Sequence, residues 1–210
     1  MLLSEPLATL APGPRGRVLS VLARADAPLT GRAVASLTRP RASLRGVQLA
    51  LDDLTAHGLV HRRLAGNAHQ YTLNREHLAA GAVLTLVDAR RVLLERIGAL
   101  VNGWDLPPTA VWLFGSTARG DDDLSSDIDL LIVRPDEIDP DIEAWQEQLT
   151  DLAERIVAWS GNVGEVLELS LSEVAIAAAR GDRLIDDLRR DAVDVAGTPS
   201  RRLLRVRSPR

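Results

Sequence analysis

The sequence predicts an α+β protein with two modules, a mainly helical one followed by a small mixed sheet with flanking helices. Residues 1–78 show three runs of helical periodicity and then two short extended runs around a Gly-Asn turn. Residues 106–197 instead alternate apolar, strand-like runs with longer helical runs. The charge also changes along the chain, because residues 1–78 hold 10 Arg against 5 Asp and Glu, whereas residues 79–210 hold 15 against 24. Such a split is typical of two domains with different partners.

Composition narrows the class of protein. The chain has 210 residues, of which 46% are hydrophobic, so it can bury a substantial core in each of two small domains. No apolar run reaches the roughly 18 residues needed to cross a bilayer, and Met1 is not followed by a charged-then-apolar signal segment. The chain has no cysteine, which excludes disulfides and thiolate metal sites. We therefore expect a cytoplasmic protein without a membrane partner.

The first module, residues 1–78, reads as three helices and a hairpin. Apolar residues at helical spacing predict a first helix, Thr30 and Ser43 are suitable N-caps for two more, and Gly58 is a typical residue just beyond a helix end. Two extended runs then flank the Gly-Asn turn, as in a β-hairpin. The expected helices begin near Arg15, Thr30 and Ser43, and the expected strands cover 59–64 and 70–73.

This order resembles the winged helix-turn-helix of bacterial transcription regulators, and the run LDDLTAHGLVHRRLAGNAHQYTLN matches its usual recognition helix and wing. The resemblance implies double-stranded DNA as a partner. Early residues of a recognition helix face the major groove, and wing residues lie near phosphates. The residues expected at DNA are Arg41, Arg45 and Gln48 on the helix, and Arg62 and Arg63 on the wing. Winged helices also serve as protein-interaction or dimerisation modules, so a homodimer is an open alternative.

Residues 79–105 read as one long connecting helix, since the segment has apolar residues near helical spacing and no proline before Pro107-Pro108. The expected domain boundary therefore lies near residue 78. In the second module, 106–197, we expect three strands at 109–114, 126–133 and 163–171, a helix at 140–160 and a final helix at 184–195. Residues 198–210 carry five Arg and little core material, which predicts a basic disordered tail.

The most informative stretch is LFGSTARGDDDLSSDIDLLIV, residues 113–133. Asp127 and Asp129 are spaced i, i+2, so in a strand they point the same way, roughly 6 to 7 Å apart. Two such carboxylates repel each other unless a cation lies between them, and Mg²⁺ is commonly bound by one or two carboxylates plus substrate phosphates. Upstream, Gly115 allows a ligand to approach the backbone closely, and Ser116 follows it. Arg119 adds a charged donor suited to a phosphate.

The pattern G-S-x-A-R-G, a short acidic loop and S-D-x-D-L-L-I-V resembles the nucleotidyltransferase superfamily that includes DNA polymerase β, and most of all its small bacterial minimal nucleotidyltransferases. The resemblance implies catalytic and metal-binding roles for Asp127 and Asp129, with Mg²⁺ or Mn²⁺ as cofactor. It also implies that Gly115, Ser116 and Arg119 bind ATP or another NTP. The family normally has a third carboxylate on the strand after the long helix. Glu168 is the first candidate for it and Glu165 the second.

Minimal nucleotidyltransferases often act as antitoxins that add AMP to a partner toxin, usually a helical HEPN ribonuclease, and relatives modify tRNA. A DNA-binding module on the same chain is typical of an autoregulated toxin–antitoxin component. The competing hypothesis is a non-enzymatic transcription regulator whose second module only binds nucleotide or dimerises. The two are separated by whether the chain transfers a nucleotide to any acceptor.

Overall fold

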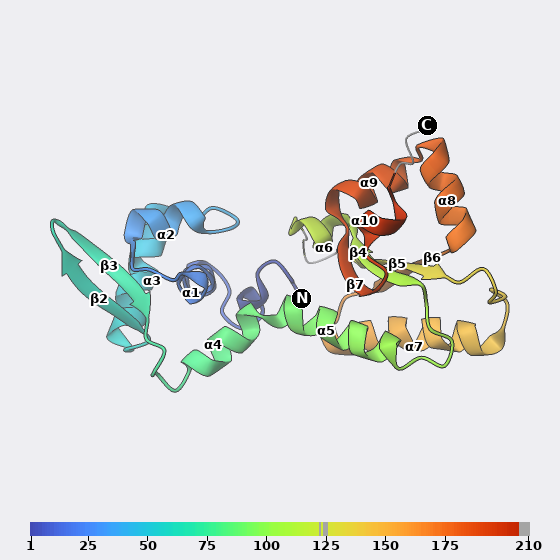
Figure 1. The fold of residues 1–210 in the computed structure, drawn as a ribbon. Helices are drawn as coiled ribbons and strands as arrows, with labels where there is room; N and C mark the ends of the chain where they lie inside the picture. The colour runs from blue at the N-terminus through green and yellow to red at the C-terminus, as the bar shows by residue number, and fades with distance from the viewer. Residues whose placement is uncertain (122, 124–125, 206–210) are drawn as a thin grey trace. The chain divides into compact units, whose positions relative to one another are not determined.

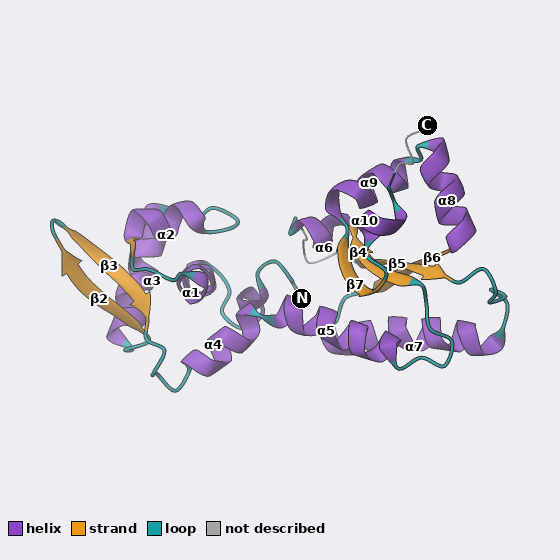
Figure 2. Cartoon of the chain, viewed as in Figure 1, coloured by secondary structure: helices purple, strands orange, loops and turns teal. Residues whose placement is uncertain are grey.

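The computed structural model describes residues 1–121, 123 and 126–205. The chain divides into two compact units, one of residues 2–90 and one of residues 91–210 together with Met1. Both helices and strands occur in each unit (Figure 2). In the described part of the chain, no helix is both long enough and apolar enough to cross a bilayer.

The first unit contains helices around a small antiparallel sheet in the order β1-β3-β2. Thr30 and Ser43 act as N-caps, because their side chains accept hydrogen bonds from the backbone N–H groups of Ala33 and Gly46. The elements are η1 (Pro6–Thr9), α1 (Pro14–Arg24), β1 (Leu29–Thr30), α2 (Gly31–Leu37), α3 (Leu44–Ala56), β2 (Val60–Ala65), β3 (Ala68–Leu73) and α4 (Ala80–Val87).

One apolar core holds this unit together. The inward stripe of α3 packs against α1 and α2 on one side and against the hairpin β2–β3 on the other. Its largest fully buried side chains include Leu22, Leu51 and Tyr71. Helix α4 belongs to the same core through Ala80 and Val83, which are buried in it. The first unit therefore extends beyond the hairpin.

The second unit is built on a four-stranded mixed sheet in the order β6-β5-β4-β7. Strands β5 and β6 are parallel, whereas β4 is antiparallel to both of its neighbours. The elements are α5 (Ala89–Asn102), β4 (Ala110–Phe114), α6 (Gly115–Arg119), β5 (Ile128–Arg134), α7 (Glu143–Ser160), β6 (Gly164–Ser170), α8 (Leu171–Arg180), α9 (Arg183–Asp191), β7 (Val193–Gly197) and α10 (Ser200–Leu203).

Helices cover both faces of this sheet, with α8, α9 and α10 on one and α5 and α7 on the other (Figure 1). Trp112, Leu131 and Val133 pack on the first of these faces against Val174 of α8 and Ile185 of α9. Strands β4 and β5 are buried on both faces, which explains why their sequences are nearly continuous apolar runs rather than alternating ones.

Three expectations for the second half of the chain are corrected. The single connecting helix of residues 79–105 is two helices, α4 and α5, divided at Asp88, and α4 packs in the first unit. The final helix expected at 184–195 ends at Asp191, because the short alternating run that follows pairs with β4 as β7. The tail expected from residue 198 forms α10, after which Leu204 is buried, so it is ordered at least to Arg205. The rest of that tail lies outside the described residues.

Candidate functional site

The two aspartates lie at the start of the central strand β5. Asp127 immediately precedes the strand, and Asp129 is its second residue. Alternation places Asp129 on the same face as Leu131 and Val133, which pack against α8 and α9. Ile128 points the other way and is fully buried. The carboxylate of Asp129 therefore lies on one face of β5 near the start of the strand, while the apolar residues of the strand are buried in the core.

Gly115 brings the Gly-Ser turn into direct contact with Asp129. It follows the last residue of β4, Phe114, which is paired with Asp129 across the sheet. Its φ is +72°, a conformation that side chains disfavour. A Cβ at this position would lie only 1.9 Å from Oδ2 of Asp129. Glycine is favoured here for two reasons: its backbone adopts a positive φ, and any side chain would collide with the carboxylate of Asp129.

Glu165, rather than Glu168, lies beside the aspartates. In the parallel pair β5–β6, Glu165 is in register with Asp129, and Glu168 is in register with Ile132. Residues three apart on a strand face opposite sides of the sheet. Glu168 accordingly forms an ion pair with Arg134, with Arg134 Nε 2.5 Å from Glu168 Oε1. Strand alternation therefore turns Glu168, the first candidate for the third carboxylate, away from the aspartates, and leaves Glu165, the second candidate, beside Asp129.

Arg119 ends the short helix α6 and lies beside the C-terminal end of α9. Its Nη1 is 3.4 Å from Oδ2 of Asp191, and its Nε is 3.6 Å from Oδ2 of Asp121. Asp191 is also held by Arg190, and these hydrogen bonds keep the pKa of Asp191 below its usual range. The Arg119 side chain is 40% exposed, so solvent reaches this ion-paired guanidinium.

The acids crowd one another. Burial raises the pKa of Asp129, the charges of Glu165 and Asp127 raise it further, and the charge of Arg119 acts in the opposite direction. Every donor here is a carboxylate oxygen, which suits a hard divalent cation that also takes oxygens from a phosphate. Among the described residues, no three His, Cys, Asp or Glu side chains are arranged as a finished metal site.

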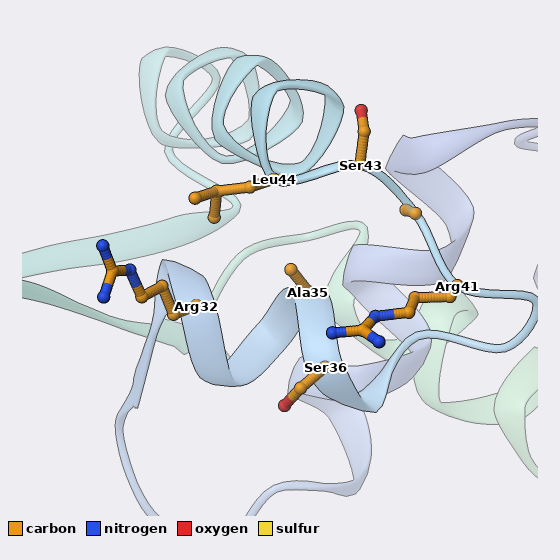
Figure 3. A pocket seen from close by; sticks show the side chains of 7 residues that line it. Arg32, Ala35, Ser36, Arg41, Ser43 and Leu44 are labelled. Atoms are coloured by element: carbon orange, nitrogen blue, oxygen red, sulfur yellow. The ribbon is translucent and has the colours of Figure 1, made fainter.

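The first unit presents a second candidate site, an arginine-rich face around the start of α3. One groove lies between α2 and the residues leading into α3, with Arg32 and Arg41 at its opposite ends (Figure 3). Another groove, of about 950 Å³, runs between α2, α3 and β3 and is lined by Arg32, Arg45, Gln48 and His69, among others. Arg32 of α2 therefore lines both grooves, with Arg41 in the first and Arg45 of α3 in the second.

The residues predicted to contact DNA fall into two groups. Gln48 donates hydrogen bonds to the Tyr71 hydroxyl at 3.0 Å and to Asp52 at 3.2 Å, and Arg62 pairs with the same Asp52 at 3.3 Å. These two side chains thus have internal partners. Arg62 is nevertheless exposed, as are Arg41, Arg45 and Arg63 in the second group.

Three side chains that matter at these sites escape sequence reasoning. Arg32 lines both grooves, and its only signal is its place two residues after an N-cap. Thr117 and Asn162 donate hydrogen bonds to the backbone beside Asp127. Nothing in their sequence context indicates this, since the contacts join segments 10 and 36 residues apart.

Comparison with known proteins agrees with the geometry of the second unit. Residues 96–176 match the family described as "Nucleotidyltransferase domain", a range that includes the Gly-Ser turn, both aspartates and Glu165. This match supports nucleotidyl transfer as the general class of chemistry. No curated protein matches the chain significantly.

One solved structure similar to this chain is described as "Crystal structure of the toxin-antitoxin with AMP-PNP". It is 19% identical, covers 50% of this chain and 76% of its own, and has a TM-score of 0.33.

Proposed function

We propose that the second unit is a metal-dependent nucleotidyltransferase that moves a nucleoside monophosphate from ATP or another NTP to a protein or RNA hydroxyl. The observation that carries this proposal is the contact between Gly115 and Asp129. It joins an acid suited to a cation and a turn suited to phosphates into one small site. The family match over residues 96–176 supports the same class of chemistry.

In the proposed reaction, an oxygen–phosphorus bond forms between the acceptor hydroxyl and the α-phosphorus, and the bond to the β-phosphate breaks. Pyrophosphate leaves, and the hydroxyl proton passes to solvent. Gly115 and Ser116 hold the outer phosphates, and Arg119 offsets part of their charge. Asp127, Asp129 and Glu165 would hold Mg²⁺ or Mn²⁺, which supplies charge neutralisation and lowers the pKa of the attacking hydroxyl when bound. The chain's own task is mainly positioning.

The direct test is label transfer from α-labelled ATP, with Mg²⁺, to components of a cell lysate or to tRNA. We expect label on a macromolecule with the wild-type chain and none with Asp127→Ala. Circular dichroism of the variant controls for folding. A wild-type chain that labels no acceptor with any of the four NTPs would contradict the proposal.

We also propose that the first unit is a winged helix-turn-helix that binds double-stranded DNA. Its support is the order of elements, the strand order β1-β3-β2 and the exposed arginines around the start of α3. Arg45→Ala should weaken operator binding by about 1–3 kcal/mol and relax the sequence preference at the base that Arg45 contacts. Arg62→Ala, which removes an arginine already paired with Asp52, is the matched control and should have a smaller effect. Equal losses from the two variants would argue against this assignment.

Together these proposals describe an autoregulated toxin–antitoxin component that reads its own operator and modifies a toxin protein or a tRNA. The other candidate is a regulator that binds nucleotide without transferring it. The observation that favours it is that Glu168, the first candidate for the third carboxylate, pairs with Arg134 and faces away from the aspartates. Nucleotide binding without label transfer, combined with operator binding, would identify the regulator.

A further inference from the structure

We propose that Thr117 and Asn162 are positioning residues that fix Asp127 by holding the backbone on either side of it. Oγ1 of Thr117 donates a hydrogen bond to the carbonyl oxygen of Asp127 at 3.0 Å. Nδ2 of Asn162 donates one to the carbonyl oxygen of Ser126 at 2.9 Å. This inference rests on the proposed nucleotidyl transfer and names residues that support its acids without touching the substrate.

Asp127 needs such support because the sheet does not hold it. Asp129 is paired on both sides, with Phe114 of β4 and with Glu165 of β6. Asp127 lies one residue before β5 begins and has no partner in either ladder within the described chain. The backbone bonds on either side of it run from N–H groups, that of Ile128 to the carbonyl of Val163 at 2.9 Å and that of Ser126 to the carbonyl of Asp123 at 3.2 Å. The carbonyls of residues 126 and 127 therefore depend on side chains.

The hydroxyl of Thr117 behaves differently from comparable hydroxyls in this protein. A Ser or Thr inside a helix can bond to the carbonyl one turn earlier. Thr55, Thr150 and Ser160 do this, bonding to the carbonyls of residues 51, 146 and 156. The hydroxyl of Thr117 instead bonds outside α6, to the carbonyl of a residue ten positions later. This hydrogen bond connects α6, which carries Gly115 and Ser116, to Asp127.

Both donors are buried, with 2% of Thr117 and 7% of Asn162 exposed. Asn162 is itself held, since its backbone N–H donates to Oγ of Ser160 at 3.1 Å. Ser126 and Asp127, whose carbonyls accept these bonds, are half-buried. A carbonyl that loses its donor there must take water or another partner, so the backbone at Asp127 would move. Such a shift changes the spacing between Asp127 and Asp129, and with it the cation affinity of the pair.

The test compares Thr117→Val, which keeps the side-chain shape but removes the hydroxyl, with Thr117→Ser, which keeps the hydroxyl. Binding of Mn²⁺ with a non-hydrolysable ATP analogue is measured by electron paramagnetic resonance, alongside label transfer. Loss of a residue that orients a metal ligand typically costs about 10- to 100-fold in metal affinity or activity. We expect a loss of that size in Mn²⁺ affinity and in kcat for Thr117→Val, and recovery of both in Thr117→Ser.

Thr38→Val is the matched control, because Thr38 is also buried and its hydroxyl also donates to a carbonyl, at 3.0 Å, but in the first unit. It should lower the Tm and leave Mn²⁺ affinity unchanged. Amide hydrogen exchange at Ile128 adds a readout without ligand, and Thr117→Val should accelerate it. Wild-type affinity and exchange in Thr117→Val would overturn the positioning role alone. A wild-type chain that binds no Mn²⁺ with the analogue would instead overturn the proposed function on which this role rests.

Discussion

Replacing Gly115 with alanine tests the contact that defines the site, and the structure allows its consequences to be worked out. The new Cβ would lie 1.9 Å from Oδ2 of Asp129, whereas ordinary contacts begin at 3.4 Å, so the carboxylate must retreat by about 1.5 Å. Displacing a catalytic group by about 1 Å can cost roughly 100-fold in rate. We therefore expect Gly115→Ala to lose at least about 100-fold in kcat/KM for label transfer.

Stability should change much less than activity. The clashing atoms belong mainly to the end of a side chain that can rotate, so the main cost to folding is an alanine at φ +72°, roughly 1–2 kcal/mol. A loss of that size lowers the Tm of a domain of this length by only a few degrees. Calorimetry and kinetics on the same preparation separate the two effects.

Gly120 provides a matched control within the same segment. Its φ is +75°, and a Cβ there would meet nothing within 4 Å. Gly120→Ala should therefore lower the Tm about as much as Gly115→Ala while retaining most of the activity. If the two variants lose activity equally, backbone strain rather than the Asp129 contact is responsible, and the reasoning about the site is refuted.

Three further predictions concern individual carboxylates. The pKa of Asp129 is raised in the folded protein, so keeping this carboxyl ionised lowers the stability once the pH exceeds the ordinary pKa of an aspartate. Asp129→Asn should therefore raise the Tm at pH 7 without metal while abolishing transfer. Glu165→Gln should lose activity with little change in the free energy of unfolding. Glu168→Gln should instead retain activity, but it should weaken the nearly buried ion pair with Arg134 and lower the free energy of unfolding by roughly 2 kcal/mol. Hydrogen bonds from the backbone N–H and the hydroxyl of Ser172 lower the pKa of Asp136. The stability that ionised Asp136 contributes should therefore be lost as the pH falls through that lowered pKa. Asp136→Ala should flatten the acid limb of a Tm–pH profile.

The first unit was largely predictable because its signals are local. The caps Thr30 and Ser43 and the turn around Gly66 each act within a few residues, and the structure places helices and a hairpin where those signals predicted them. What could not be predicted is which polar side chains are free. Gln48 and Arg62 look like DNA contacts in the sequence, yet both are engaged by Asp52, which only the packing of α3 against β2 reveals.

The second unit was less predictable because its features depend on pairing between distant strands. Glu165 and Glu168 flank the same apolar run, and only the register of β6 on β5 shows which of them lies beside Asp129. Strand β7 was predicted as the end of a helix, because the five-residue run Val193–Gly197 is too short to show alternation clearly and gains its bonds from β4. By contrast, the Gly-Ser turn and the i, i+2 aspartates could be singled out from residues close in sequence, and the pairing of β4 with β5 brings that turn against Asp129.

The most direct test of the central claim is a crystal structure with Mn²⁺ and a non-hydrolysable ATP analogue, in which anomalous scattering locates the ion. We predict Mn²⁺ between the carboxylates of Asp127 and Asp129, with the triphosphate against Gly115 and Ser116. An ion bound elsewhere, or a nucleotide whose phosphates avoid that turn, would contradict it.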